Sequence, residues 1–171
     1  ANWDWSQQIP SDHIQILLES QQDADGSWKP TQEYLDVVAA KFTDDVMRNT
    51  AYITWALVST GSRGDAVNKA IQYIQDGIDD IKDTYTLALA ANALVRYKKD
   101  DADGLKLLET LMNKAQEKDG KVWWQADSET STYAYGESAN IETTALVALA
   151  FMQAERYNDA VNKILTYLIE S

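Results

Sequence analysis

Three aspartates, Asp79, Asp80 and Asp83, follow the pattern Asp-Asp-x-x-Asp, which can bind a metal ion. Carboxylates can hold Mg²⁺ against a diphosphate group, because hard cations prefer oxygen ligands. Where an Asp-Asp-x-x-Asp motif holds Mg²⁺ in this way, it lies inside a helix that faces a cavity. Here it spans an expected turn between two helices, where aspartate commonly caps the following helix. We therefore favour a helix cap over a metal site.

Few other residues could support catalysis. The chain has no Cys, and its only His is His13. A zinc site built from Cys and His is therefore excluded, and nothing marks a nucleophile beside His13, which we interpret as a surface residue in the first turn of a helix. There is also no Gly-rich phosphate-binding loop. We predict no catalytic residue, no metal site and no cofactor.

The formal net charge of −12 restricts the classes of partner. Nucleic-acid binding needs a basic patch for phosphate contacts, and no such patch is visible. The same charge argues against binding to an anionic membrane surface. No segment is apolar for long enough to span a bilayer. We predict contact with neither nucleic acid nor membrane.

A short motif, Gln22-x-x-x-Gly26-x-Trp28, follows an apolar helix end. It does not fit a calcium loop counted from Asp23, because Gly falls at position 4 and position 12 is Tyr34. It fits the "QW" signature of α/α-barrel proteins. We expect Gly26 to end the helix, Trp28 to pack on a neighbouring pair of helices, and Gln22 to bind free backbone groups.

Four aromatic residues, Trp123, Trp124, Tyr133 and Tyr135, flank a polar stretch. Two short strands, 121–124 and 132–136, joined by that stretch would form a β-hairpin near 121–136. Successive side chains of a strand point to opposite faces, so one of the two tryptophans could be exposed. These four residues are the candidate contact surface, although a hairpin that covers one mouth of a barrel is the simpler interpretation.

The elements that position these residues are helices of two alternating kinds. Two Pro and seven Gly among 171 residues favour an all-α fold. The first kind is apolar on almost every face and must be buried on every face, whereas the second has a single apolar stripe and covers the first. The apolar segments are 50–58, 87–95 and 144–152, and the striped segments are 65–78, 103–116 and 159–170.

This alternation repeats along the chain. A shift of 94 residues places 50–75 on 144–169 without a gap, and the run Asp-Ala-Val-Asn-Lys coincides. Repeated helical hairpins with a buried inner row describe a solenoid or an α/α toroid. A further helix, from about Asp12 to Gln22, would be an outer helix whose inner partner is missing.

In its motifs and in the order of its helices, the sequence resembles the thioester domain of the α2-macroglobulin and complement family, in a bacterial or archaeal version. The likeness rests on five stretches in the same order and at similar spacing, over about residues 14 to 171. They are LLESQQDADGSW, DDVMRNTAYITWALV, DTYTLALAANAL, KVWWQ and GESANIETTALVALAFM. The resemblance implies a partial α/α toroid of alternating inner and outer helices. We expect residues 1–171 to form a single partial domain, cut from a larger protein.

The resemblance also implies chemistry that this chain lacks. The family's thioester joins a Cys to a Gln upstream of this region, and no Cys is present. Complement members activate the acyl group with a His ten residues past the QW glycine, and that position is Asp36 here. A carboxylate does not form the acyl-imidazole intermediate, so any thioester in the parent protein would favour amines over hydroxyls.

The function that the resemblance implies is that of a non-catalytic piece of an α2-macroglobulin-like endopeptidase inhibitor, a protease-trapping or target-binding protein, extracellular or periplasmic. Expected partners are neighbouring domains of the parent chain, and proteases or cell-surface targets. An incomplete inner row would expose apolar surface, so a homodimer is also expected. The alternatives are a QW-repeat enzyme of the terpene cyclase or prenyltransferase class, and a free-standing protein-binding module.

Overall fold

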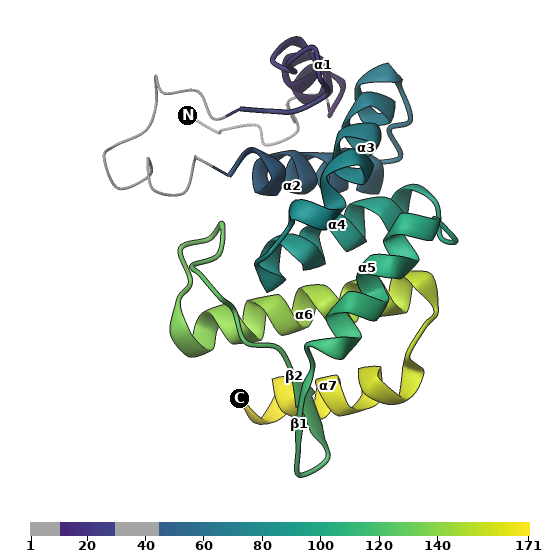
Figure 1. Ribbon diagram of the computed structural model, residues 1–171. Helices are drawn as coiled ribbons and strands as arrows, with labels where there is room; N and C mark the ends of the chain where they lie inside the picture. Colours follow the sequence, from purple (N-terminus) through teal and green to yellow (C-terminus); the bar gives the residue numbers. More distant parts are fainter. Residues whose placement is uncertain (1–10, 30–44) are drawn as a thin grey trace, which may run out of the picture.

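The computed structural model describes residues 11–29 and 45–171, with side chains from residue 15. Helices follow one another along the chain, and a two-stranded antiparallel sheet interrupts them (Figure 1). The elements are α1 (Ser11–Ser20), α2 (Val46–Ser59), α3 (Asp65–Gly77), the 3-10 turn η3 (Ile78–Asp80), α4 (Thr84–Tyr97), α5 (Ala102–Asn113), β1 (Gln116–Lys118), β2 (Lys121–Trp123), α6 (Gly136–Ala154) and α7 (Asn158–Glu170).

Helices α2, α4 and α6 form the inner row that the apolar segments predict. Helix α4 packs between α2 and α6, and each inner helix also packs against the outer helix that follows it (Figure 1). Every residue of α4 from Thr84 to Val95 is buried. A helix that is buried on every face has no polar side, which explains why the segment Leu87 to Val95 is almost entirely apolar. The prediction of an α/α toroid with alternating inner and outer helices is confirmed.

The two flanking inner helices are less buried than their composition predicts. Tyr52 of α2 is 47% exposed, and on α6 Leu149 and Met152 are 47% and 54% exposed. Within the described part of the chain, α2 and α6 each have one inner neighbour, α4, so each has a side that no second inner helix covers. Burial on every face therefore holds for α4 alone.

Capping aspartates mark the start of α2, α4 and α5, which follow Asp45, Asp83 and Asp101. Asp83 caps α4 as predicted, since its carboxylate accepts a hydrogen bond from the Thr86 backbone N–H. Three aspartates near the starts of the outer helices are not caps but lie inside the first turn, where a negative charge interacts favourably with the helix dipole. They are Asp65, Asp103 and Asp159, and the N-cap positions belong to Gly64, Asp101 and Tyr157.

The β-hairpin lies earlier in the chain than predicted. Strand β1 pairs with β2 in a register that places Gln116 opposite Trp123 and Lys118 opposite Lys121. The turn is Asp119-Gly120, with φ of 52° and 76°, as a two-residue type I′ turn requires. The predicted strand over 132–136 is wrong: Tyr133 has a φ of 65°, and α6 begins at Gly136.

Candidate functional site

The segment from Gln22 to Trp28, predicted to be a QW motif and called the QW turn below, forms a turn that fastens α1 to α3. The Gln22 amide donates to the carbonyls of Gly26 at 2.9 Å and of Ala66 at 2.8 Å. Gly26 has a φ of 91°, and a Cβ there would lie 2.4 Å from the Lys69 carbonyl oxygen. The close approach of two backbones therefore requires glycine at this position.

Trp28 completes this turn from inside the core. It is 3% exposed, and its indole N–H donates to the Leu18 carbonyl at 2.8 Å. Its backbone N–H donates to the Thr50 hydroxyl at 3.0 Å, which links the turn to the inner helix α2. With both N–H groups and the ring used inside the protein, Trp28 holds helices together and offers no surface to a ligand.

A second tryptophan repeats this arrangement. Trp124 is fully buried, its indole N–H donates to the Leu111 carbonyl at 2.6 Å, and its backbone N–H donates to the Thr144 hydroxyl at 3.0 Å. Each tryptophan thus joins the end of an outer helix to a threonine of the next hairpin's inner helix. The sequence analysis missed this equivalence, although the shift of 94 residues already places Thr50 on Thr144.

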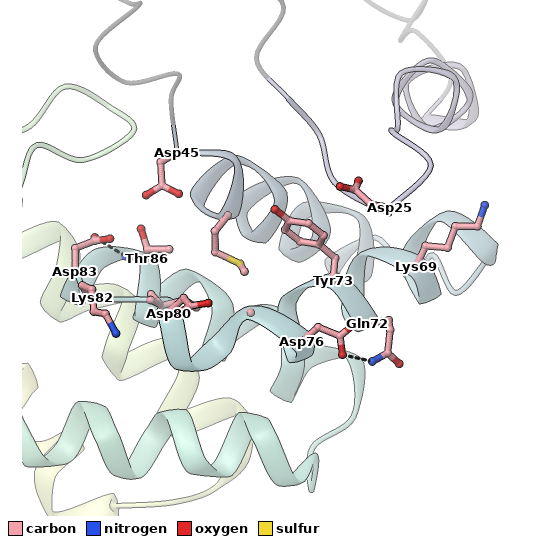
Figure 2. Close-up of a pocket in the computed structure, with 13 residues that line it drawn as sticks. Asp25, Asp45, Lys69, Gln72, Tyr73, Asp76, Asp80, Lys82, Asp83 and Thr86 are labelled. Atoms are coloured by element: carbon pink, nitrogen blue, oxygen red, sulfur yellow. Dashed lines mark hydrogen bonds between the residues drawn. The ribbon is translucent and has the colours of Figure 1, made fainter.

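A cavity of about 760 Å³ opens beside the QW turn, and we call it the acidic pocket (Figure 2). It lies between that turn, the start of α2, the second half of α3 and the turn into α4. Its carboxylates come from Asp25, Asp45, Asp76, Asp80 and Asp83. Apolar groups reach it from Met47, Tyr73 and Ile81. The sequence predicts Asp80 and Asp83 as turn residues but does not predict the pocket, because its five carboxylates come from four separate stretches of the chain.

Two groups around this pocket have shifted pKa values, Asp25 through hydrogen bonds and Tyr73 through burial and a neighbouring charge. The Ser27 hydroxyl and backbone N–H both donate to Asp25 and lower the pKa of its carboxyl, so that the carboxylate stays charged. Burial, and then the charge of Asp25, raise the pKa of the Tyr73 hydroxyl. The phenol therefore stays neutral and able to donate, in a pocket that is negative at neutral pH.

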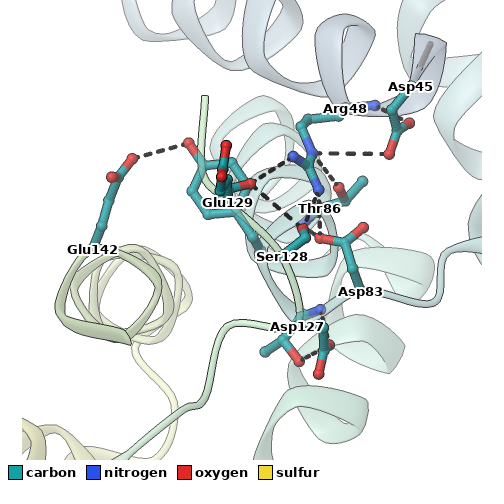
Figure 3. A network of polar contacts seen from close by, with 10 residues as sticks. Asp45, Arg48, Asp83, Thr86, Asp127, Ser128, Glu129 and Glu142 are labelled. Atoms are coloured by element: carbon teal, nitrogen blue, oxygen red, sulfur yellow. Dashed lines mark hydrogen bonds and ion pairs between the residues drawn. The ribbon is translucent and has the colours of Figure 1, made fainter. Parts of the chain in front are cut away.

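Next to the acidic pocket lies a buried arginine, Arg48, which is 8% exposed (Figure 3). Its guanidinium donates to the Asp83 carboxylate at 3.0 Å and to the Thr86 hydroxyl at 3.1 Å. It also donates, at 2.9 Å each, to the Ser128 hydroxyl and the Glu129 carbonyl. A charge buried this deeply needs such partners. Arg48 thereby joins α2, α4 and the loop that precedes α6.

Glu142 of α6 holds the same loop from the other side. Its carboxylate accepts from the Tyr85 hydroxyl at 3.0 Å (Figure 3). It also accepts from the hydroxyls of Thr130 and Thr132 at 2.7 and 2.6 Å. Asp127 accepts from both the backbone N–H and the hydroxyl of Thr84. The loop over 127–135 is therefore fixed by charged side chains, although it contains neither helix nor strand.

The predicted aromatic surface does not gather in one place. Trp124 is buried and does not belong to it, while Trp123 is half-buried and stacked on Tyr167 with ring centroids 5.6 Å apart. Tyr133 and Tyr135 are exposed, by 54% and 74%. They belong to the loop before α6, whereas Trp123 lies on the β-hairpin beside α7 (Figure 1). The candidate contact surface is therefore divided in two.

Comparison with known proteins identifies the family. A family model described as the A-macroglobulin TED domain matches residues 3–171. The chain belongs to this family. A curated relative, "Complement C3" of Lethenteron camtschaticum, is 23% identical over 171 residues, which are 92% of this chain and 10% of that protein. This TED domain therefore spans about a tenth of the length of the curated relative it matches.

The remaining predicted residues of the TED domain have different outcomes. Asp79 pairs with Lys106 at 2.8 Å, Asp80 faces the acidic pocket and Asp83 caps α4, so the Asp-Asp-x-x-Asp carboxylates are used separately. Among the described residues no group of three or more His, Cys, Asp and Glu could hold a metal ion. Asp36 and the side chain of His13 lie outside the described residues. None of the described helices is long and apolar enough to cross a membrane.

Proposed function

We propose that this TED domain is a non-catalytic part of a larger α-macroglobulin-like protein that binds or traps targets, proteases among them. The observation that carries the proposal is the family match over residues 3–171 together with the row of inner and outer helices. The curated relative is a complement protein, and this chain corresponds to a tenth of it. In such a protein the domain is one unit among several, and it contacts neighbouring domains of the same chain.

The polar groups of the described core support a structural role rather than catalysis. Arg48, Glu142 and Asp127 are each engaged in hydrogen bonds that hold helices or the 127–135 loop. General acid–base catalysis needs a titratable group within reach of a substrate, and these groups are committed elsewhere. We place the protein outside the cell or in the periplasm, where proteases and cell-surface targets are met.

The direct test uses the full-length parent protein and an endopeptidase. Residual protease activity is measured on a large protein substrate and on a small chromogenic peptide. A trap encloses the protease, so hydrolysis of the large substrate falls much further than hydrolysis of the peptide. If the parent protein changes hydrolysis of neither substrate, or lowers both to the same extent, the protease-trapping role is wrong.

A second assay tests the absence of catalysis. The chain is incubated with prenyl diphosphates and Mg²⁺, and release of diphosphate is followed. We expect no turnover above a boiled control, because the three aspartates of the motif are divided between an ion pair, the pocket and a helix cap. Turnover that Asp80→Asn abolishes would instead support the prenyltransferase alternative.

The open sides of the inner row favour a homodimer of the isolated chain. Leu149 and Met152 are exposed on α6 and Tyr52 on α2, and a second copy would remove this apolar surface from water. Sedimentation velocity at rising concentration should show a dimer that Leu149→Gln/Met152→Gln weakens. The matched control, Leu165→Gln/Ile169→Gln on α7, should leave it intact. A monomer at every concentration would rule out the dimer.

A further inference from the structure

Of the five carboxylates of the acidic pocket, Asp45 and Asp83 pair with Arg48 at 3.8 and 3.0 Å, and the other three have no ion-pair partner among the described residues. Within the described part of the chain, Asp80 has no hydrogen-bond or ion-pair partner, and Asp76 accepts only from the Gln72 amide, at 2.8 Å. The ammonium groups of Lys69 and Lys82 lie at the margin of the pocket and point away from its centre (Figure 2). Lys82 donates to the Asp79 carbonyl at 2.9 Å. The interior of the pocket is therefore negative.

Apolar surface accompanies these charges. Met47, Tyr73 and Ile81 are half-buried residues of the lining, and the Tyr73 ring projects toward the Asp45 side of the cavity (Figure 2). The face of a tyrosine ring attracts a cation. A volume of about 760 Å³ lies within the range of pockets that bind organic ligands. It exceeds what a lone metal ion would occupy.

We propose that the acidic pocket receives a lysine or arginine side chain from a basic segment of a partner protein. These two side chains combine an apolar stem with a cationic head, and the lining offers apolar groups and carboxylates side by side. The proposal rests on the proposed function for its setting, since it gives the target-binding domain a chemical class of partner. The binding step itself is a property of this chain alone.

The test measures binding of a fluorescein-labelled peptide, with two arginines separated by one glycine, to the 171-residue chain by fluorescence anisotropy. We expect saturable binding that weakens as salt rises. Asp76→Asn/Asp80→Asn should weaken it about twofold to thirtyfold, the range expected for two partly exposed charge contacts. The matched control, Asp100→Asn/Glu109→Gln, makes the same change in net charge on exposed residues of the α4–α5 turn and α5.

A variant without any charge change separates a pocket from diffuse attraction. A Cβ at Gly77 would lie 2.5 Å from the Met47 methyl group, so Gly77→Ala forces that side chain to move within the pocket. We expect weaker peptide binding in Gly77→Ala and an unchanged thermal unfolding curve. Equal weakening in both charge variants, or normal binding in Gly77→Ala, would overturn the proposal. A peptide with aspartate in place of arginine should not bind.

The outcomes of this assay and of the protease assay are independent. Peptide binding by the isolated chain does not require the parent protein to trap anything. If the pocket binds the peptide but the parent protein leaves protease activity unchanged, the proposed function is wrong and the proposal of a pocket for basic side chains is supported. If the parent protein traps a protease but no variant alters peptide binding, the pocket proposal alone fails.

Discussion

Replacement of Arg48 by methionine tests whether the buried network holds the fold together. Arg48 makes four hydrogen bonds of 2.9 to 3.1 Å from a position that is 8% exposed. Removing one member of a buried ion pair costs about 3–5 kcal/mol. Asp83 retains its cap on Thr86 and is 20% exposed, so the cost falls at the lower end. We expect Arg48→Met to lower the free energy of unfolding by about 3 kcal/mol.

Urea unfolding followed by tryptophan fluorescence measures this change. Arg48→Lys should cost less, about 1–2 kcal/mol, because an ammonium keeps the charge but not the planar set of donors. Arg156→Met, on an exposed residue, is the matched control and should stay within about 0.5 kcal/mol of wild type. A double-mutant cycle with Asp83→Asn, which preserves a capping side chain, should give a coupling of about 1–3 kcal/mol.

Two outcomes would contradict this role of Arg48. If Arg48→Met unfolds within about 0.5 kcal/mol of wild type, the guanidinium does not support the fold, and the 127–135 loop is held by Glu142 and by the hydrogen bonds between Asp127 and Thr84. A destabilised variant with no coupling to Asp83 would show instead that the loss comes from packing of the side-chain stem.

Three further predictions concern the QW turn and its repeat. Gly26→Ala should lower the free energy of unfolding by at least about 2 kcal/mol in urea titrations, because strain at positive φ adds to the clash with Lys69. Gly61 also has a positive φ, of 90°, but nothing lies within 4 Å of a new Cβ there, so Gly61→Ala should cost only about 1 kcal/mol. Equal costs for the two variants would contradict the close approach of Gly26 to Lys69. Thr50→Val and Thr144→Val should each cost about 1–3 kcal/mol, since each leaves a buried tryptophan N–H without its acceptor, and a loss in only one variant would end the equivalence of the two sites. Ser27→Ala should raise the pKa of Asp25 toward its ordinary value of 3.8, as read by NMR titration. Because the pKa of Asp25 is lower in the folded state, the stability that the Ser27 hydrogen bonds contribute is present at neutral pH and is lost as pH falls through the folded pKa. An unchanged titration of Asp25 would show that the Ser27 hydroxyl does not act on the carboxylate.

Much of the fold follows from local pattern. The segment Leu87 to Val95 has no polar face, so only burial on all sides can accommodate it, and α4 is buried in this way. The alternation with striped helices then determines which elements are inner and outer. Burial of Tyr52 and Leu149 was overestimated because composition describes a helix but not how many neighbours surround it.

The hairpin was misplaced because two signals competed. The aromatic residues over 132–136 suggested a strand, but their backbone includes a positive φ at Tyr133. The stretch Gln116–Lys118 has no apolar alternation, yet Asp119-Gly120 is a strong two-residue turn signal. The Asp119-Gly120 dipeptide predicts where the hairpin lies, whereas the aromatic residues over 132–136 do not.

Little of the site could be predicted, because it depends on contacts between distant segments. Arg48 reaches Glu129, 81 positions along the chain. One signal was available: a lone arginine at the start of an apolar inner helix must be either exposed or paired. The acidic pocket draws its carboxylates from four separate stretches, and no spacing rule connects Asp25 with Asp80.

Native-state hydrogen exchange, resolved by residue, measures whether α4 is the middle inner helix of the row. We expect the amides of α4 to exchange most slowly and only through global unfolding, while those of α1, α3 and α7 open by smaller fluctuations. Faster exchange in α4 than in the outer helices α3 and α5 would contradict the arrangement.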